Sequence, residues 1–297
     1  MILLRVLPLL VAAVAFAQSP LAGVIDFHVH CDPDSMPRSI DAIDLARLAK
    51  QRGMRGLVLK NHYESTAALA YVVRKEVPGI EIFGGIDLNR TVGGINPAAV
   101  ERMTMMKGGW GRVVWMPTFD AENQVRYSKE QRPFVPVSRN GRLLPEVLDV
   151  IALAAKHGLT LETGHSSAQE CLMIVREARR QGVSRIVVTH AMLPPVSMTV
   201  PQMRAAASDG AYLEFVYNGL IGPNKSNSMR EYADAIRQVG PRSCLLASDL
   251  GQANNPLHPD GLAAFFDGLA REGISSADIA LMSKTNPARA LGLPETN

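Results

Sequence analysis

Residues 24–34 read VIDFHVHCDPD, a short apolar run that ends in two histidines and a polar turn. The run over residues 24–28 has the length and composition of a strand that is buried on both faces. A doubly wound open sheet would favour a glycine-rich phosphate-binding turn directly after this first strand. The chain has His30, a cysteine and two aspartates there instead. The stretch therefore argues against the doubly wound sheet and favours a parallel barrel.

Seven further apolar runs follow, and helical patterns separate them. These runs are rich in Val, Ile or Leu and cover residues 56–59, 80–86, 112–116, 159–163, 185–189, 211–216 and 244–248. The helices between them have readable starts, such as Ser39 before an amphipathic run and Asn96 before Pro97. Eight strand–helix units in a chain of this length predict a single (β/α)8 TIM barrel.

The N-terminal residues have the pattern of a secretory signal peptide rather than of structure. Arg5 precedes an apolar run over residues 6–17, which ends in the small-residue cleavage motif Ala15-Phe16-Ala17. The run is too short to cross a bilayer, which needs roughly 20 residues. The alternative is a buried N-terminal strand or helix. We expect residues 1–17 to be removed after Ala17, which leaves a periplasmic or secreted barrel domain over residues 18–297 without membrane attachment.

Composition and charge narrow the class of protein further. The chain has 297 residues, of which 47% are hydrophobic, so it can bury a sizeable core. Lys and Arg number 31 against 28 Asp and Glu, a net charge of +3 without a basic block, so no nucleic-acid partner is predicted. Three cysteines cannot form a disulfide framework. We expect a small-molecule substrate as the partner, and a homo-oligomer is possible because barrels of this type often associate.

Five of the seven histidines lie at or just past the ends of predicted strands. They are His28, His30, His62, His165 and His190, and Asp249 follows the last strand. Catalytic groups of a (β/α)8 barrel come from the C-terminal ends of its strands. Residues two apart on a strand share a face, so His28 and His30 point the same way. Imidazoles beside a carboxylate match zinc or another first-row divalent metal, so the pattern predicts a metal site.

This arrangement resembles the amidohydrolase superfamily, in which an HxH pair follows the first strand and His, His and Asp follow the fifth, sixth and eighth. The resemblance implies a metal-dependent hydrolase in which an activated water attacks an amide, ester or lactone bond of a small molecule. It implies a divalent metal, with zinc as the first candidate, on His28, His30 and one or more of His165, His190 and Asp249. Asp249 would then accept the proton of the water, and His190 would polarise the scissile carbonyl.

Two further segments bear on this resemblance. Residues 285–293, TNPARALGL, are similar to a segment near the C-terminus of that superfamily. Members with two metal ions carry a bridging Lys or Glu after the fourth strand, and residues 112–118 contain neither, which implies one ion rather than two. Lys60 and Glu162 are the nearest substitutes. Lys60 is equally well explained as a salt-bridge partner, and Glu162 as a residue that orients a ligand histidine.

A second metal-dependent family competes. Residues 56–65, GLVLKNHYES, resemble the second strand of the PHP (polymerase and histidinol phosphatase) family, in which a His follows this strand and an acid follows the third. His62 and Asp87 would then join the other ligands in a multinuclear phosphoesterase site. That family usually has Glu in place of Asp87 and a further His where this chain has Gly251. A lyase such as a decarboxylase, or a ligand-binding protein, is the other alternative on the same barrel.

Substrate contacts are expected in the loops. The connection over residues 118–144 lacks clear periodicity, and connections of that length are usually lids or binding loops. Arg126 lies in it and would bind an anionic substrate such as a carboxylate, although a solvated loop is the simpler interpretation. Asn218, after the seventh strand, and His258 are further candidates for substrate contact. Glu214 is expected to face outward or to pair locally.

Overall fold

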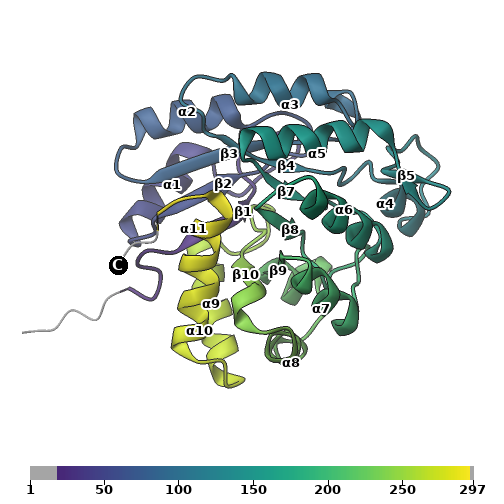
Figure 1. Ribbon diagram of the computed structural model, residues 1–297. Coiled ribbons are helices and arrows are strands. Elements are labelled where there is room, and N and C mark those ends of the chain that lie inside the picture. Colours follow the sequence, from purple (N-terminus) through teal and green to yellow (C-terminus); the bar gives the residue numbers. More distant parts are fainter. Residues whose placement is uncertain (1–18, 295–297) are drawn as a thin grey trace, which may run out of the picture.

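The structure is a computed structural model that describes residues 19–294, so the predicted leader over residues 1–17 lies outside the described residues. Eight parallel strands lie at the centre and helices surround them (Figure 1). In sheet order the strands are β1 (Ile25–Val29), β2 (Gly56–Leu59), β3 (Glu81–Asp87), β4 (Gly111–Trp115), β7 (Thr160–Glu162), β8 (Ile186–Val188), β9 (Ala211–Val216) and β10 (Cys244–Ala247). This order confirms the predicted (β/α)8 barrel.

The barrel closes where the first and last strands meet. Just past β10, the Asp249 N–H donates to the His28 carbonyl at 2.9 Å. The His30 N–H donates to the Leu250 carbonyl at 2.8 Å. These bonds place the HxH segment beside the aspartate, although more than two hundred residues separate them in the chain.

Helices cover the outer face of the barrel. They are α1 (Ala42–Gln51), α2 (Ala67–Glu76), α3 (Pro97–Thr104), α5 (Pro145–His157), α6 (Ala168–Arg180), α7 (Val200–Ser208), α8 (Met229–Val239), α9 (His258–Arg271), α10 (Ser276–Ala280) and α11 (Asn286–Leu291). Short-range signals set several ends: Ser167 and Glu170 form a capping box at α6, and Gly158 ends α5 in the left-handed conformation. No helix in residues 19–294 is long and apolar enough to cross a membrane.

The first helix begins later than Ser39 predicts. The Ser39 N–H donates to the Gly251 carbonyl at 2.9 Å, which holds this part of the chain against the loop after β10. Asp41 is the N-cap, and its carboxylate accepts from the N–H groups of Ile43 and Asp44. A tertiary contact thus outweighs the local capping signal of the serine.

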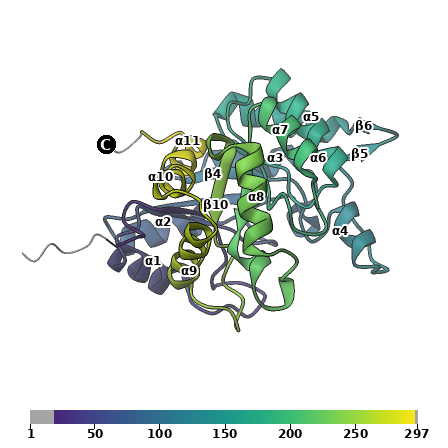
Figure 2. The ribbon, with the colours of Figure 1, turned by 90° about the horizontal axis from the view of Figure 1, so that it is seen from below.

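The long connection after β4 carries structure of its own. It holds helix α4 (Glu122–Tyr127) and a two-stranded hairpin of β5 (Ser138–Arg139) and β6 (Arg142–Leu143). Figure 2 shows that α4 and the hairpin project from the same side of the barrel. The Val135 N–H bonds to the Asp120 carbonyl at 2.7 Å, so the connection folds back on its own beginning.

Candidate metal centre and active site

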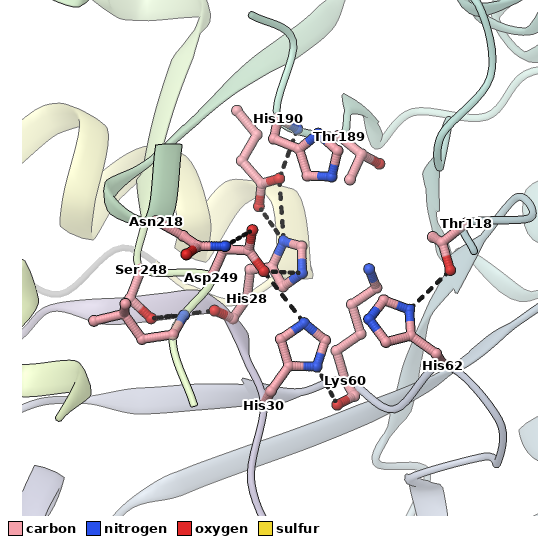
Figure 3. A network of polar contacts seen from close by, with 12 residues as sticks. His28, His30, Lys60, His62, Thr118, Thr189, His190, Asn218, Ser248 and Asp249 are labelled. Carbon is pink, nitrogen blue, oxygen red and sulfur yellow. Dashed lines mark hydrogen bonds and ion pairs between the residues drawn. The ribbon is translucent and has the colours of Figure 1, made fainter. Parts of the chain in front are cut away.

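His28, His30 and Asp249 form a compact group at the C-terminal ends of the strands (Figure 3). His28 lies in β1 and His30 directly after it, so the alternation of the strand turns both imidazoles to one side. Their Nε2 atoms lie 3.1 Å and 3.2 Å from the same atom, Oδ1 of Asp249. All three residues are buried. Strand alternation and barrel closure together therefore build the group.

Hydrogen bonds on the far side of each ring decide which nitrogen carries the hydrogen. His28 Nδ1 donates to the Glu214 carboxylate at 3.3 Å, and His30 Nδ1 donates to the Lys60 carbonyl at 3.1 Å, a shorter contact than the 3.4 Å from Arg38 Nη2. Burial raises the pKa of Glu214 to about 7, and in its ionised form it only accepts, as the Lys60 carbonyl does. Both Nε2 atoms then keep a lone pair. Burial lowers the pKa of each histidine to about 3, so neither ring takes a proton near neutral pH.

Three lone-pair acceptors thus surround one small space, and no hydrogen lies between them. Buried acceptors repel each other at such distances unless a cation lies between them. Two neutral imidazoles and a carboxylate are ligands that zinc and other first-row divalent ions accept. Among residues 19–294, this is the one group of three or more such residues with ligand atoms within 4.8 Å of each other. The residues therefore fit one divalent metal ion.

Asp249 is held firmly in place. Its φ of 51° lies in the left-handed region, which a non-glycine residue adopts only when its surroundings require it. Asn218 Nδ2 donates to Asp249 Oδ2 at 3.2 Å and thereby turns Oδ1 toward the histidines. Asn255 Nδ2 donates to the Asn218 amide oxygen at 3.1 Å. Burial opposes ionisation of Asp249, but its pKa still lies well below the usual range, because His28, His30 and His190 attract its negative charge whenever they are protonated. Near neutral pH the three rings are neutral and Asp249 is a carboxylate.

His165 and His190 form a second pair nearby. Their Nε2 atoms lie 3.1 Å apart, and His165 Nδ1 donates to the side-chain oxygen of Gln124 at 2.8 Å. His165 Nε2 is therefore the acceptor, and His190 Nε2 carries the hydrogen. Burial lowers the pKa of His190 to about 4, so its ring is a neutral donor. The geometry makes His190 a hydrogen-bond donor at the mouth of the barrel.

Glu214 is the site residue that the sequence analysis missed, since it neither faces outward nor pairs locally. It is fully buried in β9, where it accepts from the His28 ring and, at 2.9 Å, from the His190 N–H. It thereby joins the two histidine groups. The sequence did contain a signal for this residue, namely a glutamate within the apolar run AYLEFV. A strand that is buried on both faces accommodates a carboxylate only beside polar partners, so Glu214 could have been predicted to face the site.

Three buried ionisable side chains lie among these residues, namely Lys60, Asp87 and Glu162. Lys60 Nζ lies 3.6 Å from Asp87 Oδ2, and Thr189 donates to Glu162 at 2.9 Å. Burial raises the pKa of Asp87 to about 7 and holds that of Glu162 well above its usual range. None of the three belongs to the His28, His30 and Asp249 group.

His62 is oriented by a chain of hydrogen bonds. The Thr118 hydroxyl donates to Asp87 Oδ2 at 2.9 Å and accepts from Asn89. His62 Nδ1 lies 2.9 Å from that hydroxyl, whose single hydrogen is already used, so Nδ1 donates. The His62 ring also stacks on Phe119, with the ring centroids 3.8 Å apart. His62 Nε2 therefore keeps a lone pair.

These side chains surround a cavity of about 510 Å³. Its lining includes His30, Lys60, His62, His165, His190, Asn218 and Asp249. His28 and Glu162 are completely buried behind it. The volume is that of a small-molecule site.

Two predicted substrate contacts lie elsewhere. His258, the first residue of α9, donates from Nε2 to the His30 and Leu250 carbonyls at 3.0 Å and 2.8 Å and is fully buried. It therefore supports the backbone of the metal group. Arg126 pairs with Glu122 on α4 and lines a separate groove between α4, the hairpin and α6. Neither side chain lines the cavity.

A comparison with protein families gives one match. The "Family of unknown function (DUF6282)" matches residues 23–214, well over half of the chain, so the chain belongs to this family. The matched region runs from the first strand to β9 and includes His28, His30 and Glu214 but not Asp249. A search of the curated proteins gives no match.

Solved structures with the same fold come from the amidohydrolase superfamily. An amidohydrolase from Pseudomonas aeruginosa is 12% identical, with a TM-score of 0.63 over 92% of this chain and 97% of that one. An amidohydrolase from Burkholderia multivorans with bound zinc is 15% identical, with a TM-score of 0.61 over 92% and 100%. A 2,6-dihydroxybenzoate decarboxylase from Rhizobium is 13% identical, with a TM-score of 0.56 over 91% and 99%. These likenesses confirm the resemblance at the level of the fold.

Proposed function

We propose that this member of the family of unknown function DUF6282 is a metal-dependent hydrolase that cleaves an amide, ester or lactone bond of a small molecule. The observation that carries the proposal is the convergence of His28 Nε2, His30 Nε2 and Asp249 Oδ1, three acceptors within one buried space. The fold, shared with amidohydrolases of which one was solved with bound zinc, supports the same class of chemistry.

Each residue of the site has a chemical task in this reaction. His28, His30 and Asp249 would hold the ion, which in such sites lowers the pKa of a water molecule toward neutrality. Asp249 is ionised and accepts a proton from the attacking water, then passes it to the leaving group. His190 Nε2–H, which donates to His165 Nε2 in this structure, would donate instead to the carbonyl oxygen, on which negative charge develops in the transition state.

The residues at the end of the fourth strand favour a site for a single ion, with zinc as the first candidate. β4 ends in Val114 and Trp115, which offer no bridging ligand. Lys60 points to Asp87 rather than to the metal group, and Glu162 accepts from Thr189. The PHP-like alternative would require Asp87 as a ligand. Asp87 lies outside the group of His28, His30 and Asp249, which supports the hydrolase over the multinuclear phosphoesterase.

The test is metal analysis of the purified protein next to a His28→Ala/His30→Ala variant. We expect about one zinc per chain in the wild type and a loss of the ion in the variant. The exposed His157→Ala variant is the matched control and should keep the ion. Two or three ions per chain would favour the phosphoesterase instead. If the wild type holds no ion, even after zinc is added, the proposal is wrong.

The reaction itself is tested with a panel of chromogenic esters, amides and lactones. Zinc-dependent turnover that disappears in Asp249→Asn supports hydrolysis, because the amide does not accept the proton. Release of carbon dioxide from aromatic acids, without hydrolysis of any panel member, would favour the lyase alternative that the decarboxylase fold suggests.

Export is a separate part of the proposal. We infer from the leader pattern over residues 1–17 that the mature protein begins at Gln18 and works outside the cytoplasm. N-terminal sequencing of the protein recovered from the periplasm or medium checks this. An intact N-terminus in the cytoplasmic fraction would contradict it.

A further inference from the structure

The charges that line the cavity are mostly positive. Among the described residues of its lining, Arg38, Lys60 and Lys225 are cationic, and Asp249 alone carries a carboxylate. Asp249 belongs to the metal group, so it does not offset the cations toward a substrate. Asp34 neutralises Arg38, with contacts of 2.8 Å to Nε and 2.7 Å to Nη2. Lys60 and the exposed Lys225 therefore remain as the cations available to a bound molecule.

Lys60 is the better placed of these two. Its side chain is completely buried, and its Nζ has no hydrogen-bond partner among the described residues. The nearest carboxylate oxygen, Asp87 Oδ2, lies 3.6 Å away and already accepts from Thr118. An ammonium group has three donors, and leaving them unsatisfied inside a protein is unfavourable. An acceptor atom of a ligand in the cavity would satisfy them.

A wall of aromatic rings lines the cavity beside Lys60. It is formed by His62, whose ring stacks on Phe119. Leu193 and Pro194 add apolar surface to the lining of the same cavity. Figure 3 shows Lys60 beside His62, with His30 on its other side. A ligand can therefore place a carbon skeleton against this wall while an anionic end meets Lys60.

We propose that Lys60 binds a carboxylate of the substrate, so that the natural substrate is a carboxylate-bearing amide, ester or lactone. This rests on the proposed function, because it assigns the substrate of the same site. The bond to be cleaved lies at the metal group and His190, and the carboxylate lies at the Lys60 ammonium.

The test compares two ligands that differ in one charge. Binding of glutarate and of its monoamide, glutaramate, is measured by calorimetry on the zinc-loaded protein. Each ligand has a carboxylate that can contact the ion. The ratio of their dissociation constants therefore measures how much the second carboxylate of glutarate contributes to binding. We expect glutarate to bind about tenfold more tightly, which is typical of a charge-assisted hydrogen bond.

The Lys60 variants decide whether that residue is responsible. In Lys60→Met the preference for glutarate should vanish, whereas the exposed Lys107→Met control keeps it. Because Lys60→Met leaves Asp87 without its cation, Lys60→Met/Asp87→Asn removes both charges and should also lose the preference. Equal binding of the two ligands to the wild type overturns the proposal. So does a preference that survives in both Lys60 variants, or one that only Lys225→Met abolishes.

The same titrations on metal-free protein separate this inference from the proposed function. If the wild type binds no zinc, the hydrolase proposal fails. A preference for glutarate that depends on Lys60 would still support the carboxylate site. If zinc binds and the preference is absent, the hydrolase proposal stands and the carboxylate site fails.

Discussion

The two histidine groups at the mouth of the barrel differ in what faces their Nε2 atoms. In the first group, His28 and His30 both direct a lone pair at Asp249 Oδ1, at 3.1 Å and 3.2 Å. In the second, one hydrogen lies between His165 and His190, whose Nε2 atoms are 3.1 Å apart. The first group has no hydrogen between its acceptors, whereas the second pair shares one. In the proposed function, the first group would therefore hold the metal, and the His190 donor of the second would face the substrate.

Substitution of His190 tests this division most severely. His190→Ala should lower kcat by about 10²- to 10³-fold, as the loss of a donor to a developing oxyanion does. The metal content should stay unchanged, because the ion belongs to the other group. His190→Gln restores an N–H donor and should recover part of the rate. Loss of the ion together with the rate would contradict the division and make His190 a ligand.

Glu214→Gln weakens the link between the two groups. An amide accepts more weakly than a carboxylate from the His28 Nδ1–H, so the ring is a poorer ligand. Loss of such an outer partner usually costs about 10- to 100-fold in metal affinity. Competition with a zinc chelator measures this affinity, and the exposed Glu146→Gln variant is the control. An unchanged affinity would mean that Glu214 serves the His190 backbone rather than His28.

Asn218→Ala tests how much the first group depends on the orientation of the Asp249 carboxylate. Without the Nδ2 donor to Oδ2, Asp249 turns more freely, and we expect about a tenfold loss of turnover from one charge-assisted hydrogen bond. Asn218→Asp, which replaces the donor by a second carboxylate, should be worse than Asn218→Ala. If Asn218 contacts substrate instead, KM should rise while kcat and metal affinity hold.

Asp26 is fully buried in β1, where it accepts from the Ser248 N–H at 2.9 Å, and it does not line the cavity. Asp26→Asn should therefore have the smallest effect on turnover and a clear effect on stability. Burial raises the pKa of Asp26 to about 7 from 3.8, so the folded state holds this proton where the unfolded state has lost it. The stabilisation from Asp26 is complete below about pH 4 and is lost as the pH rises through about 7. The loss is at most about 4 kcal/mol. The variant removes this titration.

Urea unfolding at pH 4 and pH 8 checks the sign of this effect. The stability of Asp26→Asn relative to the wild type should increase from pH 4 to pH 8, since the amide is uncharged at both. The exposed Asp149→Asn variant should show no such change. A constant difference between wild type and Asp26→Asn would show that Asp26 ionises normally in the folded protein.

Much of the fold followed from local patterns. The barrel strands coincide with the apolar runs, since a strand with helices on one side and the barrel interior on the other leaves no position for exposed polar residues. The HxH motif and Asp249 were visible because their side chains stand at strand ends. Glu214 was not, because its pairing with His28 joins the first barrel strand to the seventh.

The sequence by itself determined which residues can serve as ligands and on which edge of the barrel they lie, since strand alternation and strand ends are local properties. Only the tertiary structure decided their roles. Closure of the barrel set Asp249 against both imidazoles, and contacts across the barrel determined which nitrogen of each ring carries the hydrogen. The same contacts turned His258 into a backbone support and left Lys60 Nζ without a hydrogen bond, 3.6 Å from Asp87. Hydrogen-bond partners that are distant in sequence are chosen by packing, which no local pattern records.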